Sequence, residues 1–191
     1  MTPQGAIRNY IKTHEGGLSL DKADSGNWHH GVLVGSKYGV TGDVLAHYRG
    51  VPAVTAAQMA ALTVDEAVNI GLKLFYEGPH LNLLAWNSIS ASVLDMAWGA
   101  GPVQAIKLLQ RCAGTLVDGQ CGPGTAAAFA AWIGRVGEEA AARAYADARN
   151  AFYAQICAVH PANAKFLNGW RNRSNSFLPG TAWWAQFGSA A

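Results

Sequence analysis

The chain has 191 residues, of which 50% are hydrophobic and 14% are charged, and its net charge is +2. That length fits one domain, or one domain with a small second lobe, and the apolar content excludes a chain that is disordered throughout. The small net charge gives no reason to expect a nucleic-acid partner, and without an apolar run of about 18 residues we expect no membrane-spanning helix.

The predicted elements are mostly helices, because no stretch alternates cleanly between apolar and polar residues. A first helix is predicted over residues 4–14 and ends at Gly16-Gly17. Its apolar face carries Ile7, Tyr10 and Ile11. Residues 18–41 are rich in Gly, Asp, Asn, Ser and His, which predicts a loop with a short hairpin around residues 32–40.

The rest of the chain is predicted to be one helix after another. Thr55 and Thr63 are suited to cap two short helices, and Glu66 is the expected capping-box partner of Thr63. Longer helices are predicted over residues 88–98, 102–112, 123–133, 137–159 and 164–173. No linker or internal repeat is visible, so one continuous globule is the simpler organisation.

Two compositional features of the second half leave alternatives open. After residue 140 five basic residues face a single acid, Asp147, which favours either an anionic polymer as a partner or a basic solvated helix face. The three cysteines, Cys112, Cys121 and Cys157, show no metal-like spacing and are interpreted as reduced and mostly buried. Cys112 and Cys121 could pair across the intervening turn.

Glu15 is the strongest catalytic candidate among the five glutamates. It lies at the end of an amphipathic helix and is followed directly by two glycines, which leave no side chain to block a substrate. Partial burial by the helix would raise the pKa of its carboxyl group. A carboxylic acid that stays protonated near neutral pH can donate the proton that glycosidic bond cleavage requires.

The loop after Glu15 supplies a second carboxylate, Asp24, with Asp21 three residues nearer. A carboxylate on the other side of a sugar could activate water or stabilise an oxocarbenium-like transition state, although Asp24 could also simply stabilise a turn. The following polar and aromatic side chains suit a carbohydrate and are candidates for substrate binding: Asn27, Trp28, His29 and His30.

Several segments resemble one enzyme family. Residues 15–28 read EGGLSLDKADSGNW and resemble the opening signature of glycoside hydrolase family 108, a Glu-Gly-Gly followed by Asp-x-Gly. Residues 35–41 (GSKYGVT) resemble the family's Thr-x-Tyr-Gly-Ile-Thr segment. The second half resembles a predicted peptidoglycan-binding module and the family's closing motif at residues 90–97, 101–110, 118–125 and 165–173.

The resemblance implies a mainly α, lysozyme-like fold with a loop-rich active-site region and a larger helical lobe. We expect a single unit over residues 1–185, in which residues 1–85 carry the catalytic helix and loop and residues 86–185 form the lobe, followed by a tail at 186–191. The helical lobe is expected to provide a wall of the cleft rather than a free-standing binding module.

The family's catalytic glutamate corresponds to Glu15. The resemblance also makes Tyr38 and Thr41 candidates for substrate binding, together with Asp21. This chain has His29 where the family usually has threonine, and a histidine could position or deprotonate water, or else bind sugar. It also has Gly99 where the family commonly has asparagine. The catalytic set is therefore Glu15, Asp24 and His29.

The implied function is an endolysin that hydrolyses the β-1,4 bond between N-acetylmuramic acid and N-acetylglucosamine in peptidoglycan. A lytic transglycosylase acting on the same bond and a non-catalytic wall-binding or secretion-accessory protein remain alternatives. The sequence predicts a monomer without cofactor or metal, although His14, His29, His30 and Asp24 could in principle gather a cation. Lacking a Sec-type signal peptide, it is expected to reach the wall from the host cytoplasm through a holin-type opening.

Overall fold

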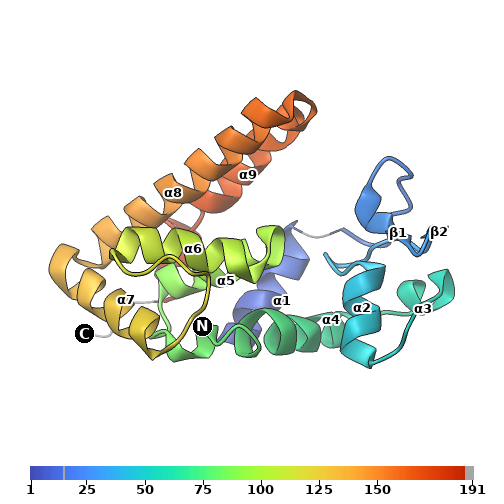
Figure 1. Cartoon of the computed structure of the whole chain (residues 1–191), viewed down its shortest axis with the longest axis horizontal. Coiled ribbons are helices and arrows are strands. Elements are labelled where there is room, and N and C mark those ends of the chain that lie inside the picture. The colour runs from blue at the N-terminus through green and yellow to red at the C-terminus, as the bar shows by residue number, and fades with distance from the viewer. Residues whose placement is uncertain (15, 188–191) are drawn as a thin grey trace. The chain divides into compact units, whose positions relative to one another are not determined.

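The computed structural model describes residues 1–14 and 16–187, which form two compact units (Figure 1). One unit comprises residues 2–78, and the other comprises Met1 with the residues from Pro79 onward. Both are mainly helical, and a small antiparallel sheet lies in the first. The predicted fold class, mainly α with a short hairpin near the N-terminus, is confirmed. The expected single unit over residues 1–185 stays a prediction.

The unit of residues 2–78 holds the loop-rich part of the chain. Its elements, in order, are α1 (Pro3–His14), η1 (Ser25–Asn27), β1 (Trp28–His29), β2 (Val32–Leu33), α2 (Gly42–Arg49), α3 (Ala56–Ala60), α4 (Val64–Ile70) and η2 (Gly71–Glu77). The strands pair in antiparallel register, with Trp28 opposite Leu33 and His29 opposite Val32. The hairpin thus begins earlier than the predicted residues 32–40, which hold its second strand, and isolated bridges follow at Ser36, which pairs with Ser19, and between Lys37 and Val40.

Local sequence signals explain most helices of this unit. The predicted apolar face of α1 is buried and the helix contacts α4 and η2. Thr55 caps α3 in a capping box with Gln58, while the Thr63 hydroxyl accepts a hydrogen bond from the Glu66 amide at the start of α4. The expected return bond from Glu66 is replaced, because its carboxylate binds Arg49 at 2.9 Å.

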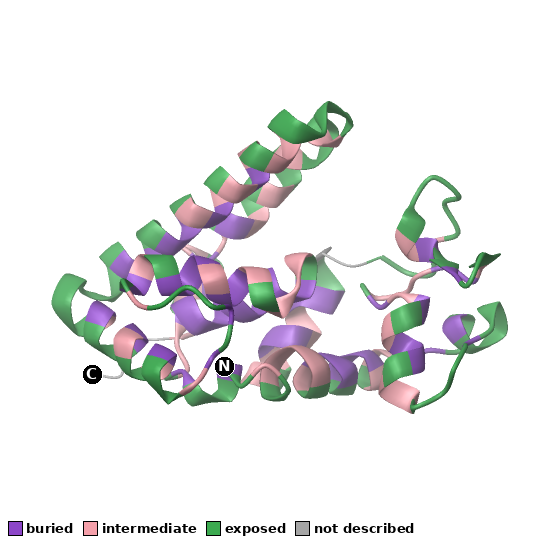
Figure 2. Cartoon of the chain, in the orientation of Figure 1, coloured by how far each residue is buried: buried purple, intermediate pink, exposed green. Residues whose placement is uncertain are grey.

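The second unit is a helical bundle around a buried central helix. Its elements are η3 (Leu81–Leu83), α5 (Ser88–Ala100), α6 (Pro102–Ala113), α7 (Pro123–Val136), α8 (Glu138–Val159), η4 (Pro161–Phe166), α9 (Leu167–Asn175) and α10 (Ala182–Ala185). α5 is buried continuously from Ser88 to Trp98 and contacts α6 and α8 (Figure 2). The buried positions of α5 include polar side chains as well as apolar ones: Ser88, Ser90, Ser92 and Asp95.

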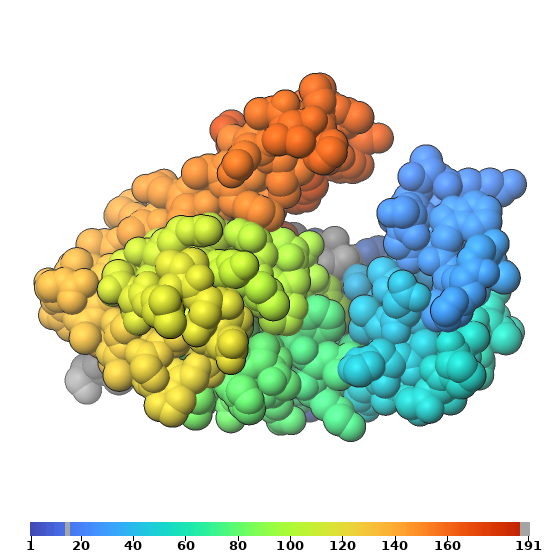
Figure 3. Space-filling model, viewed as in Figure 1, coloured from blue at the N-terminus to red at the C-terminus, as the bar shows by residue number. Residues whose placement is uncertain are grey.

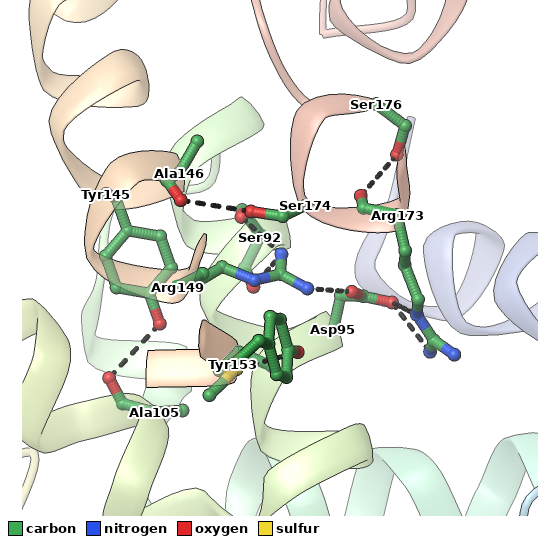
Figure 4. A network of polar contacts seen from close by, with 11 residues as sticks. Ser92, Asp95, Ala105, Tyr145, Ala146, Arg149, Tyr153, Arg173, Ser174 and Ser176 are labelled. Atoms are coloured by element: carbon green, nitrogen blue, oxygen red, sulfur yellow. Dashed lines mark hydrogen bonds and ion pairs between the residues drawn. The ribbon is translucent and has the colours of Figure 1, made fainter. Parts of the chain in front are cut away.

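A buried charge network links three helices of this unit (Figure 4). Asp95 of α5 accepts hydrogen bonds from Arg149 of α8 at 2.6 Å and from Arg173 of α9 at 2.8 Å. Burial alone would raise the pKa of Asp95, but the positive charges of Arg173 and Arg149 outweigh it and hold that pKa below its ordinary value. Arg149 is fully buried, so the expected basic surface of the C-terminal third does not include it.

Two further features of the structure are the state of the cysteines and the polarity of the helices. All three cysteines are free, Cys121 is buried, and Cys112 and Cys157 are half-buried, so the possible pairing of Cys112 with Cys121 is absent. Burial raises the pKa of both the Cys112 and the Cys121 thiol to about 11. Within the described residues, every helix is too short or too polar to cross a bilayer.

Candidate active site

The loop between α1 and α2 is closed on itself by backbone hydrogen bonds. Ser19 and Ser36 exchange bonds of 2.8 and 3.1 Å, which pin the first part of the loop against the segment after the hairpin. Gly35 makes this approach possible: its φ is +84°, and an added Cβ would lie 2.6 Å from the carbonyl oxygen of Ser19. Any side chain at position 35 would therefore push the two segments apart.

Asn27 holds the same loop from inside. Its side chain is fully buried, and its amide group donates to the Ser19 hydroxyl at 3.2 Å and to the Asp21 carbonyl at 2.9 Å. The backbone carbonyl oxygen of Asn27 accepts hydrogen bonds from the backbone amides of Val34 and Gly35. The sequence makes Asn27 a candidate for substrate binding, but in the folded loop these contacts give it the position of a support for the residues that reach the surface.

Asp24 and Asp21 are both exposed on the loop. Asp24 caps the 3-10 turn η1, with one carboxylate oxygen accepting from the Gly26 amide at 2.9 Å. Asp21 accepts from the Ala23 amide at 2.9 Å. Each carboxylate thus makes the short turn contact that its local sequence predicts while its side chain stays open to solvent, so turn stabilisation and availability to a ligand coexist.

Trp28 and His30 are exposed aromatic residues of the same loop. Trp28 is 39% exposed, and its Nε1 donates to the Lys22 carbonyl at 3.0 Å, which fixes the ring on the loop. His30 adopts a left-handed backbone conformation with φ of 50° and is exposed, with its Nε2 3.2 Å from the Pro52 carbonyl. An exposed indole held in one orientation is suited to stack on the apolar face of a sugar.

His29 lies inside the unit, unlike its neighbour His30. Only 4% of the residue is exposed, its Nδ1 lies 2.5 Å from a carboxylate oxygen of Asp43, and its Nε2 is buried without a partner among the described residues. The pair ties the hairpin to the first turn of α2. Sequence reasoning did not single out Asp43, although an acid just after the capping Thr41 signals a helix start.

Tyr38 and Thr41 frame the end of the loop. Tyr38 is half-buried with a left-handed φ of 55°, its amide donates to the Gly16 carbonyl at 3.3 Å, and the Lys37 ammonium lies 5.1 Å from its ring centre. The Thr41 hydroxyl accepts from the Val44 amide at 3.4 Å as the cap of α2. The Tyr38–Gly16 bond brings the family-like segment of residues 35–41 beside the glycines that follow Glu15.

Glu15 itself lies outside the described residues. The two glycines after it are described and exposed, and a Cβ added to either would meet no atom within 4 Å. The backbone that follows the predicted acid is therefore open, as the sequence argument requires. The described residues contain no cluster of three or more His, Cys, Asp or Glu side chains that could hold a metal ion.

Residues 8–101 match the family described as Glycosyl hydrolase 108. The chain carries a glycoside hydrolase family 108 region. That region begins in α1, includes the whole loop with Asp24 and Trp28, and ends just after α5. The match supports a glycoside hydrolase, and it confirms the family predicted from the sequence.

A second match follows the family 108 region directly. Residues 104–175, from the first turn of α6 to the end of α9, match a family described as a predicted peptidoglycan domain. The solved structure of SagA from Brucella abortus is similar in fold, with a TM-score of 0.70 and 22% identity over 94% of this chain and 97% of that chain. No curated protein matches the sequence.

Proposed function

We propose that the protein is a muramidase that hydrolyses the β-1,4 bond between N-acetylmuramic acid and N-acetylglucosamine in peptidoglycan, with Glu15 as the general acid. The observation that carries the proposal is the family 108 match across residues 8–101, in which the Glu-Gly-Gly signature begins at Glu15. The predicted peptidoglycan domain over residues 104–175 supports the bacterial cell wall as the place of action. An endolysin role, acting as a monomer released to the wall, is part of the same proposal.

The loop residues take different parts in the proposed reaction. Glu15 protonates the bridging oxygen, and Asp24, exposed on the loop, stabilises the positive charge that develops on the sugar ring or activates water. Trp28 stacks on a sugar, while Asp21, His30, Tyr38 and Thr41 contribute to the surface around it. The buried His29 and Asn27 keep this surface in place.

The deciding experiment replaces Glu15 with glutamine, which keeps the size of the side chain and removes the acidic proton. We expect Glu15→Gln to clear suspensions of purified peptidoglycan at least ~10²-fold more slowly than wild type, with an unchanged circular dichroism spectrum. Glu139→Gln, an identical change at an exposed position of α8, serves as the matched control and should clear at the wild-type rate. Wild-type clearing by Glu15→Gln would refute the proposal.

A second pair of variants tests which carboxylate assists. Asp24→Asn and Asp21→Asn both keep an oxygen that can accept the observed turn hydrogen bond, so loss of activity reports the lost charge and not a lost turn. We expect about a tenfold or greater loss of clearing rate for Asp24→Asn and a smaller one for Asp21→Asn.

Mass spectrometry of the products distinguishes hydrolysis from transglycosylation, because a transglycosylase releases an anhydro-muramoyl product that is lighter than the hydrolysis product by one water molecule.

A further inference from the structure

A groove on the second unit lies entirely within the region that matches the predicted peptidoglycan domain. It has a volume of about 620 Å³ and runs between α6 and α8, from Gln104 and Arg111 on one side to Ala148 and His160 on the other. Figure 3 shows the surface where α8, in orange, meets α6, in yellow-green. Sites for small ligands typically have volumes of ~300–1,000 Å³, so the groove is large enough for a short oligomer.

The chemistry of the lining is divided between an apolar floor and a polar rim. Leu108, Phe152 and Ile156 provide the apolar surface, and the small side chains of Ala148 and Ala151 leave room above it. The rim carries the amide side chains of Gln104 and Gln155 and two basic groups, Arg111 in the last turn of α6 and His160 at the end of α8.

Buried hydrogen bonds fix α8, one wall of the groove, to its neighbouring helices. The Tyr145 hydroxyl of α8 donates to the Ala105 carbonyl of α6 at 3.1 Å, and both partners are buried. One turn later, the buried Arg149 ties α8 to Asp95 of α5. A ligand would therefore enter a groove that is already formed and would not need to order its walls.

The charges around the groove indicate what it can hold. None of its lining residues is an aspartate or glutamate; Asp147 lies on α8 outside the lining and, like Arg111, influences the Cys112 thiol. Arginine offers donors in a fork that matches a carboxylate and accepts no hydrogen bond. Sugar hydroxyl groups need acceptors as well as donors, and here the amide oxygens and an imidazole nitrogen are the side-chain groups that can supply them.

We infer that this groove binds the peptide stem of peptidoglycan. Stem peptides combine methyl side chains, amide groups and free carboxylates, which complement the apolar surface of the groove, the glutamine side chains and Arg111 respectively. The inference rests on the proposed function, because it takes peptidoglycan as the substrate, and adds a second contact to it: the groove binds the peptide part of the polymer, independently of the glycan contacts proposed for the loop.

The test measures binding separately from cleavage. The full chain carrying Glu15→Gln is titrated onto insoluble peptidoglycan sacculi and, in parallel, onto sacculi from which an amidase has removed the stem peptides. We expect about tenfold weaker binding to the stripped sacculi, and competition for the intact ones by a synthetic stem tetrapeptide.

Two matched pairs of variants locate the binding site. Ala151→Trp fills the groove, while Ala130→Trp places the same ring on the exposed face of α7. Arg111→Glu reverses the rim charge, while Arg135→Glu makes the same change in the last turn of α7 and costs the same helix-dipole energy. We expect the two groove variants to bind intact sacculi about tenfold more weakly and the two α7 variants to bind like the parent.

The binding results can overturn the groove assignment in several ways. Parent-like binding by Ala151→Trp or Arg111→Glu, or equal binding of stripped and intact sacculi, overturns the inference; if one groove variant fails to fold, the other decides. Self-association that the groove variants abolish in sedimentation would assign the groove to a second copy of the chain and also overturn it. If wild type binds stem-dependently through the groove but clears no peptidoglycan, the proposed hydrolysis fails and the groove assignment stands.

Discussion

A guanidinium nitrogen of Arg149 lies 2.6 Å from a carboxylate oxygen of Asp95, and neither side chain has any exposed surface. The two residues are 54 positions apart and belong to α8 and α5. A second arginine, Arg173 of α9, reaches the other carboxylate oxygen at 2.8 Å. The buried carboxylate of Asp95 therefore holds α8, which forms one wall of the groove between α6 and α8, against α5 and α9.

Removing the charge of Asp95 should destabilise the protein strongly. Asp95→Asn keeps the shape of the side chain but leaves two arginines without a counter-charge, one of them fully buried. We expect a loss of about 3–5 kcal/mol in the free energy of unfolding, measured by urea denaturation. Arg8→Ala, which removes an exposed pair with Asp65, is the control and should cost about 0–1 kcal/mol. Similar costs for both variants would contradict the structural role of the buried pair.

The same carboxylate should give the protein a defined sensitivity to acid. Burial opposes ionisation, but Arg173 and Arg149 lower the pKa of Asp95 in the folded state below the unfolded value of about 3.9. The stabilisation is therefore fully present above about pH 3.9 and disappears as the pH falls through the lower folded pKa.

We expect the difference in unfolding free energy between wild type and Asp95→Asn to stay constant from about pH 7 to 5 and to shrink below about pH 3.9. Urea denaturation across this range measures it. Asp65→Asn, at an exposed ion pair, provides the reference for general charge effects. If the difference in unfolding free energy stays constant below about pH 3.9, the two arginines do not lower the pKa of Asp95 in the folded state.

How far the sequence predicts this structure depends on the distance over which each signal acts. Thr55 and Thr63 cap helices as predicted because a cap involves only the next three residues. The helix α2 was missed: its first residue is Gly42, and its Asp43 and His47 continue the polar composition of the loop. The sequence groups Arg149 with the other basic residues of the C-terminal third, since nothing local marks a partner 54 residues away.

In the candidate site, too, the sequence indicates which residues are present but not which of their side chains face solvent. Glu15, Asp24 and Trp28 stand out by residue type and motif, and the structure exposes Asp24 and Trp28 as a binding role requires. Asn27, at the end of η1, and His29, in β1, belong to the same motif, yet both are buried, where one bonds to Ser19 and the other to Asp43. Alternation across a two-residue strand decides which of two neighbouring side chains faces solvent, and register is invisible in a single motif.

The loop should depend on Gly35 more than on other glycines with positive φ. Gly35→Ala forces a left-handed backbone onto alanine and places its Cβ against the Ser19 carbonyl, whereas Gly50→Ala imposes a similar φ of +66° in open space. We expect Gly50→Ala to cost about 1–2 kcal/mol and Gly35→Ala clearly more.

Hydrogen exchange of the Ser19 and Ser36 amides, which bond across this approach, reports the local effect. Their protection should fall in Gly35→Ala and remain in Gly50→Ala. Equal loss of stability and equal protection in the two variants would mean that the close approach at Gly35 contributes nothing to the loop.

For His29, a structural role and a catalytic role predict clearly different effects of mutation. If its imidazole transferred a proton, His29→Gln would lower the clearing rate by about 10²-fold or more while the fold persisted. Its buried Nε2 and its bond to Asp43 argue instead for support of the loop. We therefore expect His29→Gln to lower the melting temperature and to reduce clearing by less than about tenfold at temperatures where it remains folded.

Asp43→Asn provides the matched comparison, because its amide oxygen can still accept from Nδ1 of His29 and its side chain is 77% exposed. A supporting pair predicts nearly wild-type clearing for this variant, since the bond that holds the imidazole survives. A proton-relaying pair predicts a large fall in kcat with little change in KM, since the charge that would stabilise the imidazolium is gone. Clearing rates measured over a range of peptidoglycan concentrations separate the two, and a loss confined to kcat in both variants would place His29 among the reacting groups.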